Sequence, residues 1–129
     1  MQGVRLLIVD DEPEAGEILS LRLSRRGVQP AYAASGEEAL ACLEKQPVDI
    51  VLLDIKMPGM DGLEVLGRIR GVYPGISVII LSGHADMGAA AKGLELGAFS
   101  YMLKPVNLEA LCHKIEDALR QRCLEKNEG

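Results

Sequence analysis

Asp49-Ile-Val-Leu-Leu53 is the stretch of sequence that decides the fold, and a second carboxylate, Asp54, follows it directly. Four consecutive aliphatic residues leave no polar side, so the segment is typical of a strand buried on both faces of a sheet. Three further apolar runs and one weaker candidate share this character: Val4–Val9, Ile76–Leu81, Phe99–Leu103 and, less clearly, Val28–Ala34. The sequence therefore predicts five short strands.

The intervals between these runs have the spacing of amphipathic helices. The spacing is clearest near the C-terminus, where apolar residues recur at i, i+3, i+4, i+7 and i+11: Leu108, Leu111, Cys112, Ile115 and Leu119. Capping residues predict helix starts at the Ser35–Glu38 box, Asp61 and Asn107. Glycines predict helix ends at Gly27, Gly71 and Gly97. Strands that alternate with helices predict an α/β fold: a single doubly wound parallel sheet with helices on both faces.

The composition is that of one globular domain. The chain has 129 residues, of which 48% are hydrophobic and 26% are charged. This length allows one sizeable core and is too short for two ordinary ones. We expect one domain over residues 1–129, with its core at about 4–123 and residues 124–129 forming a tail or the start of a linker.

Charge, hydropathy and cysteine content argue against several classes of protein. The net charge of −5 disfavours direct nucleic-acid binding, because phosphate contacts need clustered Lys and Arg. The sequence has neither a signal-peptide pattern nor an apolar span of about twenty residues, so we expect no membrane partner. Its three cysteines are odd in number and widely spaced, which argues against a disulfide framework. We therefore expect a cytoplasmic protein.

Reactive side chains follow four of the predicted strands. Asp10 and Asp11 come after the first strand, Asp54 after the third, Ser82 after the fourth and Lys104 after the fifth. Ligands bind outside the carboxyl ends of the strands in a doubly wound sheet, so we expect these side chains to meet at one edge. The carboxylates would repel one another unless they share a cation. Mg²⁺ is commonly held by carboxylates plus a phosphate, whereas zinc would favour His or Cys ligands.

Asp54 is the best candidate for a nucleophile, because it ends the central strand between the acidic pair and Lys104. When a metal ion and a lysine neutralise the charge on a transferring phosphoryl group, a carboxylate can form an aspartyl phosphate. Lys104 can pair with a carboxylate in the empty site and with phosphate oxygens in the filled one. Ser82 can donate a hydrogen bond to the same oxygens. These residues predict a phosphoryl-acceptor site.

Four motifs resemble those of receiver domains of two-component response regulators, in the right order and over nearly the whole chain. They are Ile8–Glu12, Leu53–Gly62, Leu81–His84 and Gly97–Pro105. The resemblance implies a flavodoxin-like fold with strand order 2-1-3-4-5. It also implies a phosphorelay signalling domain that is no enzyme for external substrates but assists its own phosphorylation and dephosphorylation. Its implied partners are a sensor histidine kinase and a downstream effector domain or protein, and a phosphorylation-dependent dimer is left open.

The resemblance also implies how phosphoryl group and metal are bound. Asp54 would accept the phosphoryl group from a phosphohistidine. Asp11, Asp54 and the backbone carbonyl of Lys56 would bind Mg²⁺ directly, and Asp10 would help through a water molecule. The side chains of Lys56 and His84 lie where members of this family tune the lifetime of the phosphate.

Further residues would contact the phosphoryl group or respond to it. Lys104 and Ser82 would contact its oxygens, and Ser82 and Tyr101 would act as the switch pair, with Ser82 moving toward the phosphate and Tyr101 swinging inward. The peptide bond before Pro105 would be cis. Ser82 stands where many members have Thr, which keeps the hydroxyl and loses a methyl group.

Each of these residues has a plainer interpretation when it is taken alone. Asp11 before Glu12-Pro13 is also typical of a helix N-cap. Ser82 is also typical of a turn, Lys104 of a solvated surface lysine, and Tyr101 of half-buried packing.

Two rival functions stay open at this point. A magnesium-dependent phosphohydrolase of the haloacid dehalogenase type would use a similar aspartyl nucleophile. Such enzymes require a second Asp two residues after the nucleophile, where this chain has Lys56. A pseudo-receiver that works by binding alone would need no phosphorylation. No Walker loop or dinucleotide fingerprint supports nucleotide binding.

Overall fold

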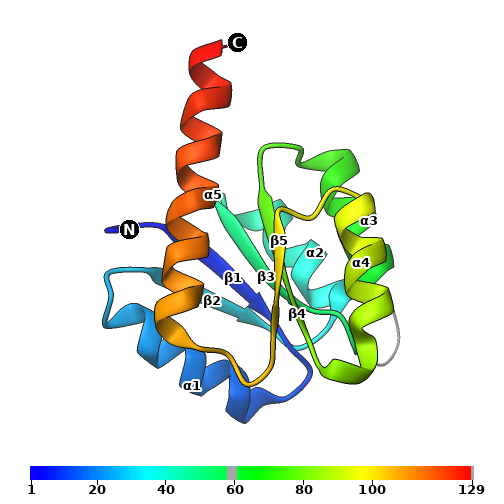
Figure 1. Ribbon diagram of the computed structural model, residues 1–129. Coiled ribbons are helices and arrows are strands. Elements are labelled where there is room, and N and C mark those ends of the chain that lie inside the picture. Colours follow the sequence, from blue (N-terminus) through cyan, green and yellow to red (C-terminus); the bar gives the residue numbers. More distant parts are fainter. Residues whose placement is uncertain (58–60, 129) are drawn as a thin grey trace.

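The computed structural model describes residues 1–57 and 61–128, in which strands and helices alternate (Figure 1). The strands are β1 (Arg5–Val9), β2 (Gln29–Ala33), β3 (Ile50–Asp54), β4 (Ser77–Ser82) and β5 (Ser100–Leu103). The helices are α1 (Pro13–Ser24), α2 (Gly36–Lys45), α3 (Gly62–Val72), α4 (Met87–Glu95) and α5 (Leu108–Glu128), and the short 3-10 helix η1 (His84–Asp86) precedes α4. Every strand boundary lies within one residue of the predicted one.

The strands form one parallel sheet in the order β2-β1-β3-β4-β5, as the resemblance implied. β3 lies at the centre between β1 and β4, and all of its residues are buried. This confirms the interpretation of the aliphatic run that ends in Asp54. The chain leaves β1 toward one side of the sheet and β3 toward the other, so the crevice between these strands is where a doubly wound sheet binds its ligand.

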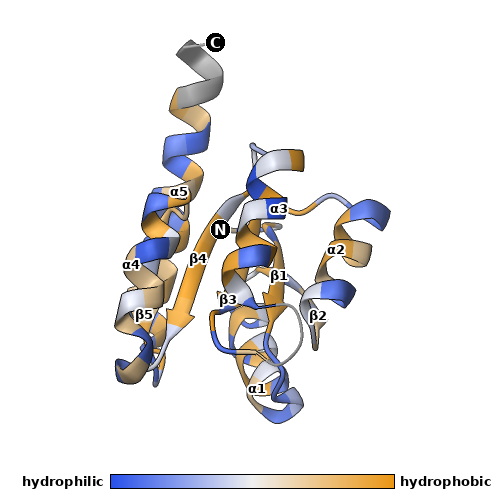
Figure 2. Cartoon of the chain, turned by 90° about the vertical axis from the view of Figure 1, so that its right-hand side faces the viewer, coloured by the Kyte–Doolittle hydropathy of each residue, from blue (hydrophilic) through white to orange (hydrophobic). Residues whose placement is uncertain are grey.

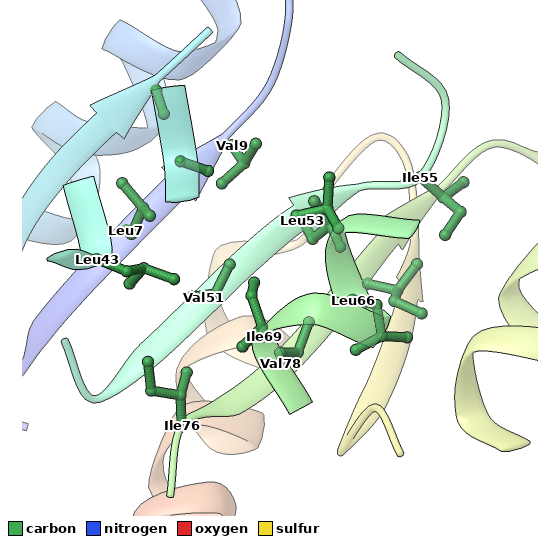
Figure 3. Close-up of a cluster of buried hydrophobic side chains, with 14 of the residues drawn as sticks. Leu7, Val9, Leu43, Val51, Leu53, Ile55, Leu66, Ile69, Ile76 and Val78 are labelled. Atoms are coloured by element: carbon green, nitrogen blue, oxygen red, sulfur yellow. The ribbon is translucent and has the colours of Figure 1, made fainter. Parts of the chain in front are cut away.

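Helices cover both faces of the sheet (Figure 2). Alternate strand residues such as Leu7, Leu53 and Ile80 pack with side chains of α2, α3 and α4, including Leu43 and Leu66 (Figure 3). The intervening strand residues pack on the other face against α1 and α5: Leu6, Ile8, Ile50, Leu52, Ile79 and Leu81. The two-residue period of the strands thus divides the core into two layers.

The predicted helix starts are confirmed. The Ser35 Oγ accepts a hydrogen bond from the N–H of Glu38 at 3.1 Å. A carboxylate oxygen of Asp61 accepts from the N–H groups of Leu63 and Glu64 at 2.6 and 3.1 Å. Asn107 caps the last helix in the same way, by accepting from the N–H of Ala110 at 2.9 Å.

The predicted helix ends are confirmed at Gly27 and Gly97, which have φ of +91° and +107°. The prediction at Gly71 is wrong, because α3 continues through this residue to Val72. Pro74 explains the difference: a proline disfavours helical geometry in the preceding residue, and Tyr73 accordingly has φ −125° and ψ 66°.

The last helix, α5, extends beyond the N-terminal edge of the sheet (Figure 1). Its Arg122 contacts Asp49 at 3.1 Å, and the same carboxylate oxygen lies 3.1 Å from the guanidinium of Arg5 on β1. The helical backbone continues as far as Glu128, and the expectation of a tail or linker at 124–129 stays a prediction. No helix within the described ranges is both long and apolar enough to cross a membrane.

Candidate functional site

The structure brings the predicted site residues together at the carboxyl edge of the sheet. Asp10 and Asp11 follow β1, Asp54 and Ser82 end β3 and β4, and Lys104 follows β5. The carboxyl ends of parallel strands lie at the same edge of the sheet, so residues at or just after these ends are brought close together. A pocket of about 580 Å³ opens at this edge. It is lined by Asp11, Glu12, Asp54, Lys56, Met57, Gly83, Asp86 and Lys104.

Three carboxylates crowd this edge. One oxygen each of Asp10, Asp11 and Asp54 lies within 4.8 Å of the other two. Asp10 and Asp54 are buried, with 4% and 5% of their surface exposed. Like charges this close are stable only with cations beside them, and the oxygen-only donor set suits a hard divalent ion such as Mg²⁺. The residues present therefore fit the metal that the sequence predicted.

Lys104 supplies one positive charge to this cluster. Its Nζ lies 2.8 Å from Oδ2 of Asp54 and 3.4 Å from Oδ2 of Asp10. Burial acts to lower the pKa of Lys104, but the hydrogen bond and charge of Asp54, together with the charge of Asp10, outweigh it and the pKa is raised. The Lys104–Pro105 peptide bond is cis, as predicted. The plainer interpretation of Lys104 as a free surface lysine is wrong.

Asp54 is held at both carboxylate oxygens. Oδ1 accepts a hydrogen bond from the backbone N–H of Lys56 at 3.1 Å, and Oδ2 accepts from Lys104. Burial raises the pKa of Asp54, while the bonds from Lys104 and Lys56 oppose that rise. The carboxylate is thus fixed in orientation at the pocket, with its charge stabilised chiefly by one lysine.

Asp10 and Asp11 differ in how they are held. Asp10 accepts a hydrogen bond at Oδ1 from the backbone N–H of Glu12, at 2.9 Å. Helix α1 begins at Pro13 with Glu12 as its N-cap residue, so the alternative interpretation of Asp11 as the cap is wrong. Within the described ranges, the Asp11 carboxylate accepts no hydrogen bond. It is free to act as a ligand.

The predicted switch residues lie on β4 and β5. Ser82 is fully buried, and its hydroxyl donates to the carbonyl of Gly83 at 3.0 Å. Tyr101 is half-buried and packs against the core cluster beneath α3 and α4. Lys56 is exposed at the pocket, and His84 lies in η1. Part of the second motif, residues 58–60, lies outside the described residues.

Two residues near the site were not predicted. The hydroxyl of Tyr32 donates a hydrogen bond to the backbone carbonyl of Asp10 at 2.5 Å. Asp86, in η1, lines the same pocket as Asp11, Asp54 and Lys104. Neither residue carries a local signal, because each reaches the site only through the packing of β2 or of the β4–α4 connection.

A comparison with family models matches residues 6–116 to the response regulator receiver domain. The chain belongs to this family. Its receiver fold places it among the phosphorelay signalling domains of two-component systems, and receiver domains are signalling switches. The resemblance that the four motifs suggested is therefore confirmed.

Receiver-domain relatives differ in length. The transcriptional regulatory protein GlrR of Escherichia coli (strain K12) is 41% identical over 116 residues, which are 90% of this chain and 26% of that protein. The sporulation initiation phosphotransferase F of Bacillus subtilis is 35% identical over 121 residues, 94% of each chain. This chain thus spans about a quarter of the length of GlrR and nearly all of the second relative.

Solved receiver structures share the whole fold. A response regulator receiver domain protein from Clostridium thermocellum aligns with a TM-score of 0.90 and 32% identity, covering 94% of this chain and 98% of that one. NtrX from Brucella abortus, solved with ADP, aligns with a TM-score of 0.92 and 29% identity over 98% of this chain and 29% of its own.

Proposed function

We propose that this receiver domain is a switch in which Asp54 accepts a phosphoryl group from the phosphohistidine of a sensor histidine kinase. The observation that carries the proposal is the placement of Asp54: a buried carboxylate at an open pocket, 2.8 Å from the Lys104 ammonium and beside two further carboxylates. A carboxylate so placed can act as a nucleophile toward a phosphoryl group whose charge is neutralised.

In the transfer step, one oxygen of Asp54 attacks phosphorus and forms an O–P bond. The P–N bond to the imidazole breaks, and its electron pair returns to the ring nitrogen. Lys104, which already contacts Oδ2 of Asp54, can pair with the incoming phosphoryl oxygens, so the developing charge meets a fixed ammonium. In a later hydrolysis step, a water oxygen would attack phosphorus, the O–P bond to Asp54 would break with its electron pair returning to the carboxylate, and inorganic phosphate would leave.

Asp11, Asp54 and the backbone carbonyl of Lys56 would bind Mg²⁺ directly, and Asp10 would bind through a water molecule. The closeness of the three carboxylate oxygens supports this ligand set. When bound, the ion neutralises charge on the phosphoryl oxygens. Asp10 also accepts the second hydrogen bond of Lys104, which ties the metal ligands to the lysine.

Ser82 and Tyr101 would convert phosphorylation into a change of surface. The Ser82 hydroxyl now donates to Gly83 and would turn to a phosphoryl oxygen instead, which shifts the start of the β4–α4 connection. Half-buried Tyr101 would then move inward on the neighbouring strand. The surface of α4, β5 and α5 would thereby change its affinity for a downstream effector domain, a protein partner or a second copy of the chain.

The phosphodonor would dock beside the pocket on α1. Ile18 and Leu21 of this helix are 56% and 54% exposed, so α1 presents apolar side chains to solvent. Ile18 also lines a groove with apolar and charged walls, whose other residues are Asp10, Glu12, Ala15, Leu19, Arg22, Leu81, Lys104, Pro105 and Val106. A kinase surface that combines apolar and charged residues would complement this side of α1.

We place this domain in the cytoplasm as a non-enzymatic module that makes no direct nucleic-acid contact. The phosphohydrolase alternative is disfavoured because Lys56, and not a second Asp, lines the pocket two residues after Asp54. Mg²⁺-dependent turnover of a phosphate ester beyond one equivalent would revive it. A pseudo-receiver would bind partners without any phosphoryl transfer.

Intact mass spectrometry after incubation with acetyl phosphate and Mg²⁺ tests the proposal. The wild type should gain one phosphoryl group, about 80 Da, and Asp54→Asn should gain none. Asp86→Asn is the matched control, since Asp86 lines the same pocket and should leave the gain intact. A folded wild type that gains no mass would support the pseudo-receiver instead.

A further inference from the structure

Tyr32 contacts the loop that carries the first two carboxylates. Its hydroxyl donates a hydrogen bond to the backbone carbonyl of Asp10 at 2.5 Å. We propose that Tyr32 is a positioning residue for divalent cation binding, because its hydroxyl fixes the peptide between Asp10 and Asp11 and so places the Asp11 carboxylate. The inference rests on the proposed function in one respect, since it takes the carboxylate cluster as a magnesium site.

Strand β2 binds both backbone polar groups of Asp10. The Asp10 N–H donates to the carbonyl of Ala33 at 3.1 Å, which extends the β1–β2 pairing one residue beyond β1. Tyr32, which pairs with Ile8 in that ladder, then reaches over to the Asp10 carbonyl. The peptide after Asp10 therefore cannot rotate without breaking its bond to Tyr32.

Asp11 depends on this peptide for its position. In the ranges that the structure describes, Asp10 and Asp54 have carboxylates held by hydrogen bonds, whereas that of Asp11 has none. Its oxygen nevertheless lies within 4.8 Å of theirs. The Asp10 carbonyl and the Asp11 nitrogen belong to one planar unit. A hydroxyl that fixes the carbonyl thus also fixes the direction in which the chain enters Asp11.

Gly16 on α1 makes room for the Tyr32 ring. A Cβ at position 16 would lie 2.6 Å from Cδ1 of Tyr32 and closer still to Cε1. Gly16 is helical and its φ is not positive, so ring packing, and not backbone freedom, accounts for glycine here. Tyr32 is 36% exposed, so a larger residue would push the ring outward and away from Asp10.

The test compares Mg²⁺ binding of Tyr32→Phe, Tyr73→Phe and the wild type by isothermal titration calorimetry. Tyr73 is the matched control, because it lies beside Asp49 at the opposite end of the sheet. We expect Tyr32→Phe to bind Mg²⁺ about three- to ten-fold more weakly, the loss that one hydrogen bond represents, and Tyr73→Phe to bind like the wild type. At saturating Mg²⁺, Tyr32→Phe should be phosphorylated by acetyl phosphate at the wild-type rate. A variant that was merely destabilised would not combine weaker Mg²⁺ binding with an unchanged rate at saturation.

Gly16→Ala provides a second, independent variant. It should weaken Mg²⁺ binding as Tyr32→Phe does, and adding it to Tyr32→Phe should cost little more, since both changes remove the same contact. Equal Mg²⁺ affinity of Tyr32→Phe and the wild type would overturn the inference while leaving the proposed function intact. If the wild type bound Mg²⁺ no better than Asp54→Asn, the magnesium site itself would fail, and the role of Tyr32 with it.

Discussion

Replacing Lys104 by methionine removes the cation that two buried carboxylates share. The side chains of Asp54 and Asp10 are 7% and 6% exposed, and their only ion pairs among the described residues are with Lys104, at 2.8 and 3.4 Å. Breaking a buried ion pair by removing one partner costs about 3–5 kcal/mol. A third of the Lys104 side chain is exposed, so water screens part of its charge. We expect the variant to lose about 2–3 kcal/mol of unfolding free energy at neutral pH without Mg²⁺.

The loss should depend on pH in a definite direction. Burial already raises the pKa of Asp54, and Lys104 opposes that rise, so the variant should have a still higher pKa at Asp54. A group whose pKa is higher in the folded than in the unfolded state takes up its proton first in the folded state, so stability rises as pH falls through that pKa. The deficit should be largest near neutral pH and shrink toward acid pH.

Urea unfolding at several pH values measures this deficit. Circular dichroism is the suitable signal, because the chain has no tryptophan. Lys92→Met is the control, since Lys92 is an exposed lysine on α4. An unfolding free energy equal to that of Lys92→Met, or a deficit that stays constant from neutral to acid pH, would refute the assignment of Lys104 as the counter-charge.

Two further predictions concern the scaffold. Gly62→Ala should destabilise the fold by about 2 kcal/mol or more, because the added Cβ would lie 2.7 Å from the carbonyl oxygen of Ile55. Gly67→Ala, on the same helix but with open space around the added Cβ, should stabilise the fold by about 0.5–1 kcal/mol. Thermal unfolding of the two variants beside the wild type checks this. The Asp49→Asn variant should lose about 1 kcal/mol of unfolding free energy at neutral pH. This difference from the wild type should vanish on acidification. Burial acts to raise the pKa of Asp49, but the hydrogen bonds and charge of its arginine partners outweigh burial and hold the pKa below its ordinary value. The contribution of Asp49 is therefore fully present above that ordinary value and is lost as pH falls through the folded pKa. Unfolding curves of Asp49→Asn that parallel the wild type at every pH would contradict this.

The strands and the site edge could be predicted because each depends on local sequence. A run such as Ile50–Asp54 is buried whichever neighbours it has, and the residues after parallel strands must meet at one edge once the fold is known. Helix starts at Ser35 and Asp61 were predictable for the same reason, since a cap bonds to its own helix.

Contacts between distant residues could not be predicted in this way. Tyr32 reaches Asp10 across 22 positions, and Arg122 reaches Asp49 across 73. Both contacts depend on strand register and helix placement. Gly93 illustrates the same limit: an added Cβ would collide with Ile80 on β4, so the glycine permits close helix–sheet packing that no local pattern indicates. The helix end predicted at Gly71 rested on the frequency of glycine at helix ends, whereas Pro74 determines that α3 continues to Val72.

Borohydride trapping of the phosphorylated protein tests the central claim most directly. Borohydride reduces an acyl phosphate to an alcohol, so an aspartyl phosphate is converted to homoserine at the residue that carried it. After incubation with acetyl phosphate and Mg²⁺, peptide mapping should find homoserine at position 54. Homoserine at position 10 or 11 in place of 54, or at no position in a protein that remains folded, would contradict the account of Asp54 as the phosphoryl acceptor.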